Sequence, residues 1–189
     1  MQSVLSRRTA IAGRTSDRAA GSVEQTAQFI TFTIGAEEYG IDIMVIREIK
    51  GWSDTTPIPK APQHMRGVIN LRGVIVPIFD LRARFGMGLT DPTRTHVVII
   101  VDAGTRMVGL LVDAVSDIIA VEPGAIRPVP ELGLAADDSL LQGLVPLDDR
   151  LVTLVSLDGL FGRRSDPTTA IDTVAAEAAA DAAKMSATV

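Results

Sequence analysis

Hydrophobic positions along this chain come in short runs that are separated by Gly, Pro and Asp, and no long stretch follows the period of an amphipathic helix. Val and Ile dominate these runs, as they do in β-strands. The pattern therefore predicts an all-β body with only short helical turns, over residues 44–49 and 81–85. The strands that it predicts are residues 28–34, 39–43, 67–71, 74–81, 97–102, 107–112, 141–145 and 151–157.

The order of predicted elements repeats within the chain. The segment GIDIMVIREI from Gly40 matches GLLVDAVSDI from Gly109 at an offset of 69 residues, and GVINL from Gly67 matches GLVPL from Gly143 at an offset of 76. The difference between the two offsets indicates an insertion of seven residues in the second copy. Its most natural place is the turn-rich stretch after Pro130. Such self-similarity predicts two copies of one structural unit.

One copy covers about residues 28–86 and the other about residues 97–162. Each holds about five strands in roughly 60 residues, the size of a small barrel whose interior is filled by its own side chains. A domain this small is marginal alone. We therefore expect two five-stranded SH3-like β-barrels packed side by side, with a groove at the joint and edge strands open to partners.

The two ends of the chain lack this strand pattern. Residues 1–27 mix Arg, Ser, Ala, Thr and Gly, which predicts a disordered arm, and residues 165–189 form an Ala-rich tail with a thin apolar helical face. Arg7 and Arg8 are not followed by the apolar region of an export signal. No run reaches the ~18 apolar residues of a membrane span. We therefore expect a cytoplasmic protein without membrane insertion.

The amino-acid composition limits the kinds of partner and site that the protein can have. Hydrophobic residues make up 47% of the chain and charged residues 22%, which is typical of a folded soluble protein. Lys and Arg number 18 against 23 Asp and Glu, a net charge of −5 that argues against nucleic acid as a partner. The chain has no Cys and two His, which excludes disulfides and thiolate sites and leaves little for a metal. No cofactor is expected.

Catalytic patterns are absent from the sequence. Adjacent carboxylates occur at residues 37–38, 137–138 and 148–149, all in predicted turns, and neighbours in an extended chain point to opposite sides. His64 and His96 have no Ser or Asp at a spacing that suggests a triad. These observations predict that the protein is not an enzyme.

Two other readings stay open at this point. A small β-barrel enzyme would use carboxylates such as Asp80 or Asp158, and a cleft where two carboxylates converge would favour it. An RNA-binding SH3-like barrel would need a clustered basic face, against which the net charge and the scarcity of aromatic residues argue.

The segment GVINLRGVIVPIFDL, from Gly67 to Leu81, stands out because a tight turn joins two strongly apolar strands. Arg72 lies in this turn just before Gly73, so its guanidinium should project from the barrel, where it could bind a carboxylate in a bidentate way. A solvated turn charge is the alternative reading. The residues expected to fill the core are Val74, Val76, Ile78 and Phe79.

This segment resembles the CheW-like domain family of bacterial chemotaxis coupling proteins. EEYGIDIMVIREI from Glu37, VGLLVDAVSDII from Val108 and IRPVPE from Ile126 carry the same resemblance, which covers about residues 28–162 within a domain expected over residues 28–164. The same module forms the regulatory domain of the histidine kinase CheA and the front half of CheV. We expect no kinase, phosphoacceptor or receiver domain beside it in this sequence.

The resemblance implies a non-enzymatic adaptor that couples methyl-accepting chemoreceptors to CheA in cytoplasmic arrays at the membrane. In that family the groove between the barrels takes the receptor helix, and the end of one barrel pairs with the homologous regulatory domain of the kinase. The receptor- or kinase-facing residues that it implies here are Ile46, Glu48, Arg72, Val97 and Ile118.

Overall fold

The computed structural model describes residues 26–104, 106–130, 140–147 and 150–161, and these residues form short strands with only brief helical segments. The strands are β1 (Ala27–Ile34), β2 (Glu37–Asp42), β3 (Ile46–Gly51), β4 (Met65–Leu71), β5 (Val74–Asp80), β6 (Val97–Asp102), β7 (Met107–Val112), β8 (Ala114–Val121), β9 (Leu141–Leu147) and β10 (Arg150–Val155). The helical segments are η1 (Ile43–Val45), α1 (Leu81–Arg84), η2 (Pro123–Ala125) and α2 (Leu157–Phe161). Residues 1–25 of the expected arm lie outside the described residues. The expected tail and the expected insertion after Pro130 lie outside them as well.

All eight expected strands are present, and two more were missed. The helical turn expected over residues 44–49 is limited to η1, because the chain from Ile46 onward pairs with β6 as strand β3. The other missed strand, β8, pairs with β1. Both contain several charged or small residues, so pairing with a neighbour rather than local pattern makes them strands. The helical turn expected over residues 81–85 is present as α1.

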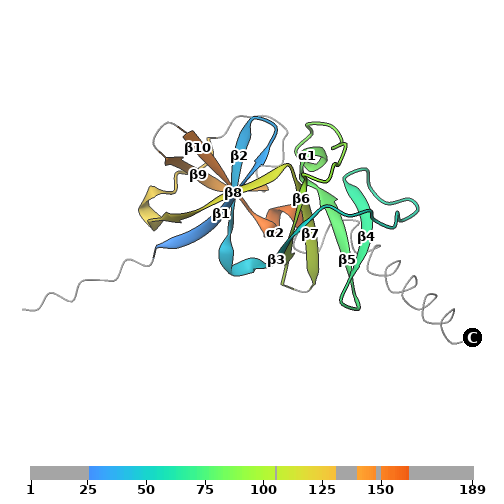
Figure 1. Ribbon diagram of the computed structural model, residues 1–189. Coiled ribbons are helices and arrows are strands. Elements are labelled where there is room, and N and C mark those ends of the chain that lie inside the picture. Colours follow the sequence, from blue (N-terminus) through green and yellow to red (C-terminus); the bar gives the residue numbers. More distant parts are fainter. Residues whose placement is uncertain (1–25, 105, 131–139, 148–149, 162–189) are drawn as a thin grey trace, which may run out of the picture.

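The strands form two five-stranded sheets that lie side by side (Figure 1). We call the sheet with the order β8-β1-β2-β10-β9 barrel 1, and the sheet with the order β3-β6-β7-β5-β4 barrel 2. Each contains one parallel pair, β2 with β10 in barrel 1 and β5 with β7 in barrel 2. The architecture is the expected all-β pair of small barrels.

The barrels do not coincide with the two halves of the chain. Barrel 1 combines β1 and β2 from the first half with β8, β9 and β10 from the second, and barrel 2 combines β3, β4 and β5 with β6 and β7. The expectation that residues 28–86 form one subdomain and residues 97–162 the other therefore needs correction. The repeat is real, since β4 and β9 begin 76 residues apart, but the first two strands of each copy join the other copy's barrel.

A single bridge closes each sheet into a barrel. Thr56, which follows β3, pairs with Val68 of β4 through two hydrogen bonds of 2.9 Å, and Arg127, which follows β8, pairs with Leu144 of β9 through two of 2.8 Å. Gly67 lies beside the first bridge with φ +128°, where a Cβ would stand 2.3 Å from the carbonyl oxygen of Thr56. Only glycine allows this close approach of two backbones.

Apolar side chains fill three clusters. One cluster fills barrel 1 around Phe29 and Leu154, and another fills barrel 2 around Val76 and Ile100. The third and largest lies between the barrels, where Phe32 of β1 packs in one cluster with residues of β6 and β7. The barrels are thus joined by a core of their own, as expected for two units too small to be stable alone. Among the described residues, no helix has the length and hydrophobicity to cross a membrane.

Candidate functional site

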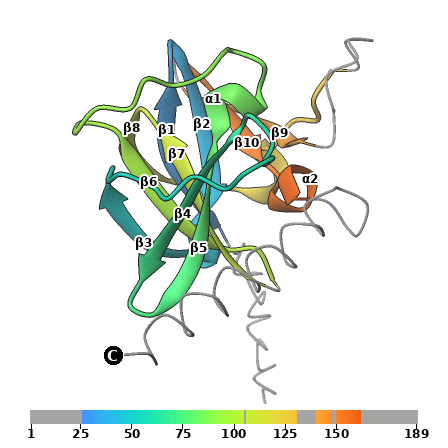
Figure 2. The ribbon, with the colours of Figure 1, turned by 90° about the vertical axis from the view of Figure 1, so that its right-hand side faces the viewer.

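Arg72 lies at the tip of the β4–β5 hairpin, which projects from barrel 2 (Figures 1 and 2). Both turn residues have positive φ, 53° at Arg72 and 90° at Gly73, which is the combination of a type I′ hairpin turn. The amide of Gly73 donates a 2.7 Å hydrogen bond to Oδ1 of Asn70. This turn leaves the side chain of Arg72 82% exposed, as its position in the sequence predicts.

Arg72 and Glu48 form an ion pair, although they are 24 residues apart in the sequence. Nη2 of Arg72 lies 3.2 Å from Oε2 of Glu48 on strand β3. An exposed pair of this kind contributes only about 0–1 kcal/mol to stability. Its position, rather than its strength, makes it a candidate for recognition.

Apolar side chains are also exposed on the strand and the hairpin that carry the pair. Ile49, the neighbour of Glu48, and Val74 and Ile75, which follow the turn at Arg72, are all partly open to solvent. The sequence-based expectation that Val74 fills the core is wrong, because the residue lies at the hairpin tip beyond the barrel interior, 46% exposed. Val76, Ile78 and Phe79 are buried, as expected.

The remaining site residues are spread over both barrels. Ile46 and Val97 lie at opposite ends of the β3–β6 ladder, where Ile46 pairs with Val101 and Val97 pairs with Gly51. Both are half-buried against the shared core. The structure therefore brings Glu48 and Arg72 into contact and leaves Ile46 and Val97 apart on the strands beside them.

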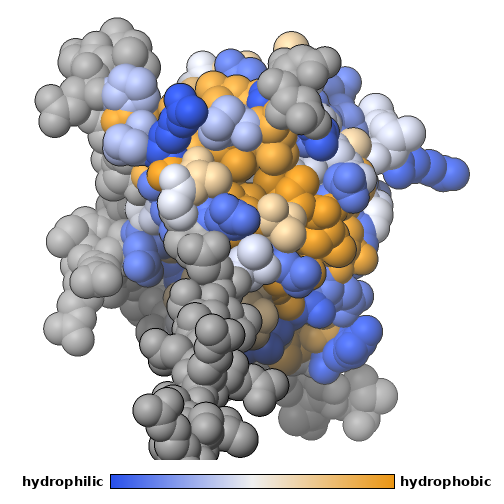
Figure 3. Space-filling model, turned by 90° about the vertical axis from the view of Figure 1, so that its left-hand side faces the viewer, coloured by the Kyte–Doolittle hydropathy of each residue, from blue (hydrophilic) through white to orange (hydrophobic). Residues whose placement is uncertain are grey.

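Ile118 belongs to barrel 1. It lies on strand β8 opposite Ile30 of β1 and is 54% exposed. Figure 3 shows a broad hydrophobic area on the side of the molecule that barrel 1 forms. Strand β8 has β1 as its one strand neighbour among the described residues, so it is an edge of its sheet. Ile118 thus adds an exposed apolar side chain from the second barrel.

Asp80, a candidate in the enzyme reading, is held by its own chain. It is fully buried, and its carboxylate accepts hydrogen bonds from the amide of Thr90 at 2.8 Å, the hydroxyl of Thr90 at 2.8 Å and the amide of Ala83 at 3.2 Å. Arg66 lies 3.8 Å away. These contacts cap α1 and fix the segment that leads to β6. The role of Asp80 is therefore structural.

Nor do the described residues gather other catalytic groups. A surface pocket of about 340 Å³ has no carboxylate in its lining, which consists of Gln63, His64, Ala83, Gly86, Gly88 and Leu89. The part of the chain that the structure describes holds no group of three His, Asp or Glu side chains that could bind a metal. In the part of the chain that the structure describes, at least five arginines form ion pairs with carboxylates, which lowers the basic character that an RNA-binding face would need: Arg47, Arg66, Arg72, Arg82 and Arg150.

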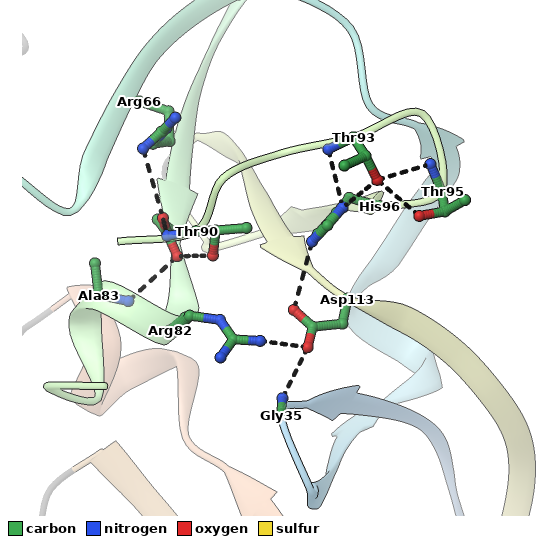
Figure 4. Close-up of polar contacts among 10 residues, drawn as sticks. Gly35, Arg66, Arg82, Ala83, Thr90, Thr93, Thr95, His96 and Asp113 are labelled. Carbon is green, nitrogen blue, oxygen red and sulfur yellow. Dashed lines mark hydrogen bonds and ion pairs between the residues drawn. The ribbon is translucent and has the colours of Figure 1, made fainter. Parts of the chain in front are cut away.

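Sequence reasoning missed a polar cluster centred on Asp113 (Figure 4). The carboxylate of Asp113 contacts Arg82 at 2.5 Å, the amide of Gly35 at 2.7 Å and Nε2 of His96 at 3.8 Å. These residues belong to four separate segments of the chain, so no spacing within one element marks them as a group. A turn Gly and a charged residue at a strand boundary were the only local signals.

The surroundings of Asp113 change the acidity of its carboxyl group. Partial burial acts to raise its pKa, but the hydrogen bonds from Arg82 and Gly35 and the charges of Arg82 and His96 outweigh this, so the pKa lies below its ordinary value. The pKa of Asp102 is also lowered, chiefly by its hydrogen bond from Arg47. Asp113 is therefore held as a carboxylate.

Comparison with known proteins agrees with this geometry. Residues 28–165 match the family described as the CheW-like domain. The chain is 44% identical to the chemotaxis protein CheW of Rhizobium meliloti over 71% of this chain and 86% of that protein, and 41% identical to CheW of Klebsiella aerogenes over 78% and 88%.

A solved structure, that of the scaffolding protein TtCheW from Thermoanaerobacter tengcongensis, superposes with a TM-score of 0.68 at 32% identity, covering 75% of this chain and 91% of that one. The family match spans residues 28–165, which include almost all of the two-barrel body described above. With its two closed barrels, its repeated strand order and these matches, the chain belongs to the CheW-like domain family.

Proposed function

We propose that this protein is a non-enzymatic chemotaxis adaptor that couples methyl-accepting chemoreceptors to the histidine kinase CheA in signalling arrays. Family membership supports the role, because relatives bear the name chemotaxis protein CheW and a solved relative is described as a scaffolding protein. Barrel interiors filled by their own side chains support the non-enzymatic part.

The observation that carries the proposal is the ion pair of Arg72 and Glu48. These two partly exposed charges lie on a projecting hairpin and an edge strand, which also carry the exposed apolar residues Val74 and Ile49. In protein interfaces, apolar contacts supply affinity while charges at the rim select partner and orientation. This combination favours a protein partner over a small substrate.

The receptor-facing surface that we propose takes residues from both barrels. Glu48 and Arg72 supply its charges, and Ile46, Val97 and Ile118 supply apolar contacts. An amphipathic receptor helix laid along the joint between the barrels would reach both sets, which is the helix-in-groove mode of recognition. The partners are the chemoreceptors on this surface and the regulatory domain of CheA at the end of a barrel, with no nucleic acid.

The proposed location is the cytoplasm, at the membrane-associated receptor array. Each contact there needs to be only modest. A coupling of about 1–3 kcal/mol between two sites is enough to transmit a signal, and many linked copies raise the overall affinity by avidity.

A binding experiment with purified proteins tests the proposal. The full chain is mixed with a receptor cytoplasmic fragment, with the regulatory domain of CheA, and with both together, and complexes are separated by affinity capture. A coupler must hold both partners in one complex. Capture of one partner only, or competition between the two, would refute the adaptor role.

Arg72→Asp provides the site-specific arm of this experiment, and Arg150→Asp is its matched control. Both arginines are at least half-exposed and ion-paired with a glutamate, Arg150 with Glu38 at 3.0 Å. We expect loss of receptor capture with Arg72→Asp and normal receptor capture with Arg150→Asp. Equal loss in both variants would mean that the surface is wrongly assigned.

A further inference from the structure

Asp113 stands where the chain crosses from one barrel to the other. It follows β7 of barrel 2 directly and precedes β8 of barrel 1. Its amide donates a 3.1 Å hydrogen bond to the carbonyl oxygen of Thr33 on β1. The backbone at this crossing is therefore already fixed to barrel 1.

The side chain of Asp113 connects the same point to both barrels. Its Oδ2 atom accepts a 2.7 Å hydrogen bond from the amide of Gly35 in the β1–β2 turn of barrel 1 and a 2.5 Å hydrogen bond from Nη2 of Arg82 in α1, which follows β5 of barrel 2. Its Oδ1 atom lies 3.8 Å from Nε2 of His96, which precedes β6 of barrel 2. Figure 4 shows these groups converging on one carboxylate.

His96 is itself held in place. Its Nδ1 atom accepts a 3.0 Å hydrogen bond from the amide of Thr93 and lies 2.9 Å from the hydroxyl of the same residue. Because Nδ1 is an acceptor, the ring of a neutral His96 carries its proton on Nε2, the atom that faces Asp113. The imidazole is thus oriented toward the carboxylate by its own loop.

Directional contacts of this kind add to the orientation that packing in the shared core gives the barrels. The hydrophobic effect that drives apolar burial is non-directional, whereas a charge-assisted hydrogen bond depends on both distance and angle. One carboxylate bonded to a barrel 1 turn and a barrel 2 helix therefore restricts rotation of one barrel against the other.

The cluster also borders the surface proposed above. Val97 follows His96 directly in the sequence, and Ile118 lies five residues beyond Asp113 on β8. These are the apolar residues that barrel 2 and barrel 1, respectively, would present to a receptor helix. Their spacing depends on how the two barrels are oriented.

We propose that Asp113 is a positioning residue, which fixes the orientation of the two barrels through Gly35 and Arg82 and so sets the spacing of Val97 and Ile118. The contacts of Asp113 with Gly35 and Arg82 carry the effect on barrel orientation, and its effect on Val97 and Ile118 as receptor contacts rests on the proposed function.

Distance measurements between spin labels test the effect of Asp113 on barrel orientation. The chain has no natural cysteine, so labels can be attached at Ser53→Cys in barrel 2 and Gln142→Cys in barrel 1, both exposed positions. Double electron–electron resonance on the full chain should give a broader or shifted distance distribution for Asp113→Asn than for the parent. Arg82→Gln removes the Arg82–Asp113 hydrogen bond by changing the donor, and it should alter the distance distribution in the same way. If Asp113→Asn does not fold, Arg82→Gln provides the test.

Two control variants separate positioning from loss of stability. Asp102→Asn breaks the Arg47–Asp102 pair, which joins β3 and β6 within barrel 2, and Val76→Ala removes buried apolar volume inside barrel 2. Neither should change the distance distribution. An unchanged distribution in both Asp113→Asn and Arg82→Gln, or an equal change in Val76→Ala, would overturn the proposal.

Binding to the receptor fragment tests the effect on Val97 and Ile118 as receptor contacts. Asp113→Asn should weaken receptor binding by about fivefold or more, while the regulatory domain of CheA binds as before. A changed distance distribution with unchanged receptor affinity would overturn the link to Val97 and Ile118. If the parent protein binds no receptor fragment, the proposed function fails, and the spin-label distances still decide the role of Asp113.

Discussion

Arg72 at the tip of the β4–β5 hairpin and Glu48 on β3 lie 3.2 Å apart, so the two charges that the sequence singles out for a partner are paired with each other in the free protein. A partner that uses either charge must therefore compete with the other member of the pair or bind both together. Because the pair is exposed, breaking it costs little stability, and its loss should be visible in recognition.

Arg72→Asp should leave the thermal unfolding of the protein nearly unchanged and abolish receptor-dependent stimulation of the kinase. The new carboxylate faces Glu48 across open solvent, where repulsion is worth less than about 1 kcal/mol. Calorimetry and a coupled kinase assay measure the two effects. A variant that fails to fold would show that Arg72 is structural.

The double variant Glu48→Lys with Arg72→Asp tests whether a partner contacts these two charges directly or whether only the ion pair between them is needed. It restores an ion pair of reversed polarity at the same place. Signalling should stay lost in the kinase assay, because a partner reads the position of each charge. Recovery of signalling would mean that only the intramolecular contact is needed.

Ile118→Asp should disrupt receptor binding with a change in the free energy of unfolding below about 0.5 kcal/mol, because surface substitutions are usually this mild. Its neighbour Ile119 is buried in the barrel 1 core. Ile119→Asp should therefore unfold much of the protein, since an unpaired charge would be buried. Denaturant titration and receptor capture compare the two. Equal destabilisation would place Ile118 in the core instead.

Gly67→Ala should destabilise the protein by about 3 kcal/mol, because the new methyl group would overlap the carbonyl oxygen of Thr56 and open the bridge that closes barrel 2. Gly73→Ala is the matched control. Gly73 also has a positive φ, 90°, but nothing lies within 4 Å of its Cβ position. It should cost only about 1 kcal/mol of backbone strain. Equal losses in denaturant titrations would show that strain, not close approach, matters at Gly67.

Acid should weaken the cluster at Asp113. Its pKa in the folded protein lies below the ordinary value, so the carboxylate stabilises the fold above the pKa of the unfolded chain, ~3.9. That stabilisation is lost as the pH falls through the lower, folded value. The difference in unfolding free energy between the parent and Asp113→Asn should therefore be present at neutral pH and shrink below about pH 4.

Urea titrations from pH 7 to pH 2 measure this difference. Asp102→Asn serves as the control, since the Asp102 carboxyl is also held as a carboxylate but its partner Arg47 is 56% exposed, against 27% for Arg82. Its effect should be smaller at every pH. A parent–Asp113→Asn difference that is independent of pH would rule out the carboxylate as the cause.

Local patterns were enough to locate eight of the strands and the exposed turn at Arg72, because alternation and turn chemistry act over a few residues. They failed at β3 and β8, which become strands by pairing with β6 and β1. The Asp113 cluster was missed for a related reason. Its members come from four separated segments, and only folding brings Gly35, Arg82 and His96 within 4 Å of the Asp113 carboxylate.

The sequence by itself determined that the chain carries two copies of one strand-rich unit, because the same apolar and glycine pattern recurs at offsets of 69 and 76 residues. Which barrel each strand joins was decided only by the tertiary structure. Since β1 and β2 resemble β6 and β7, either pair could complete either barrel, and local propensities cannot distinguish the two arrangements. Long-range pairing of β2 with β10 in barrel 1 and of β5 with β7 in barrel 2 selects the exchanged one.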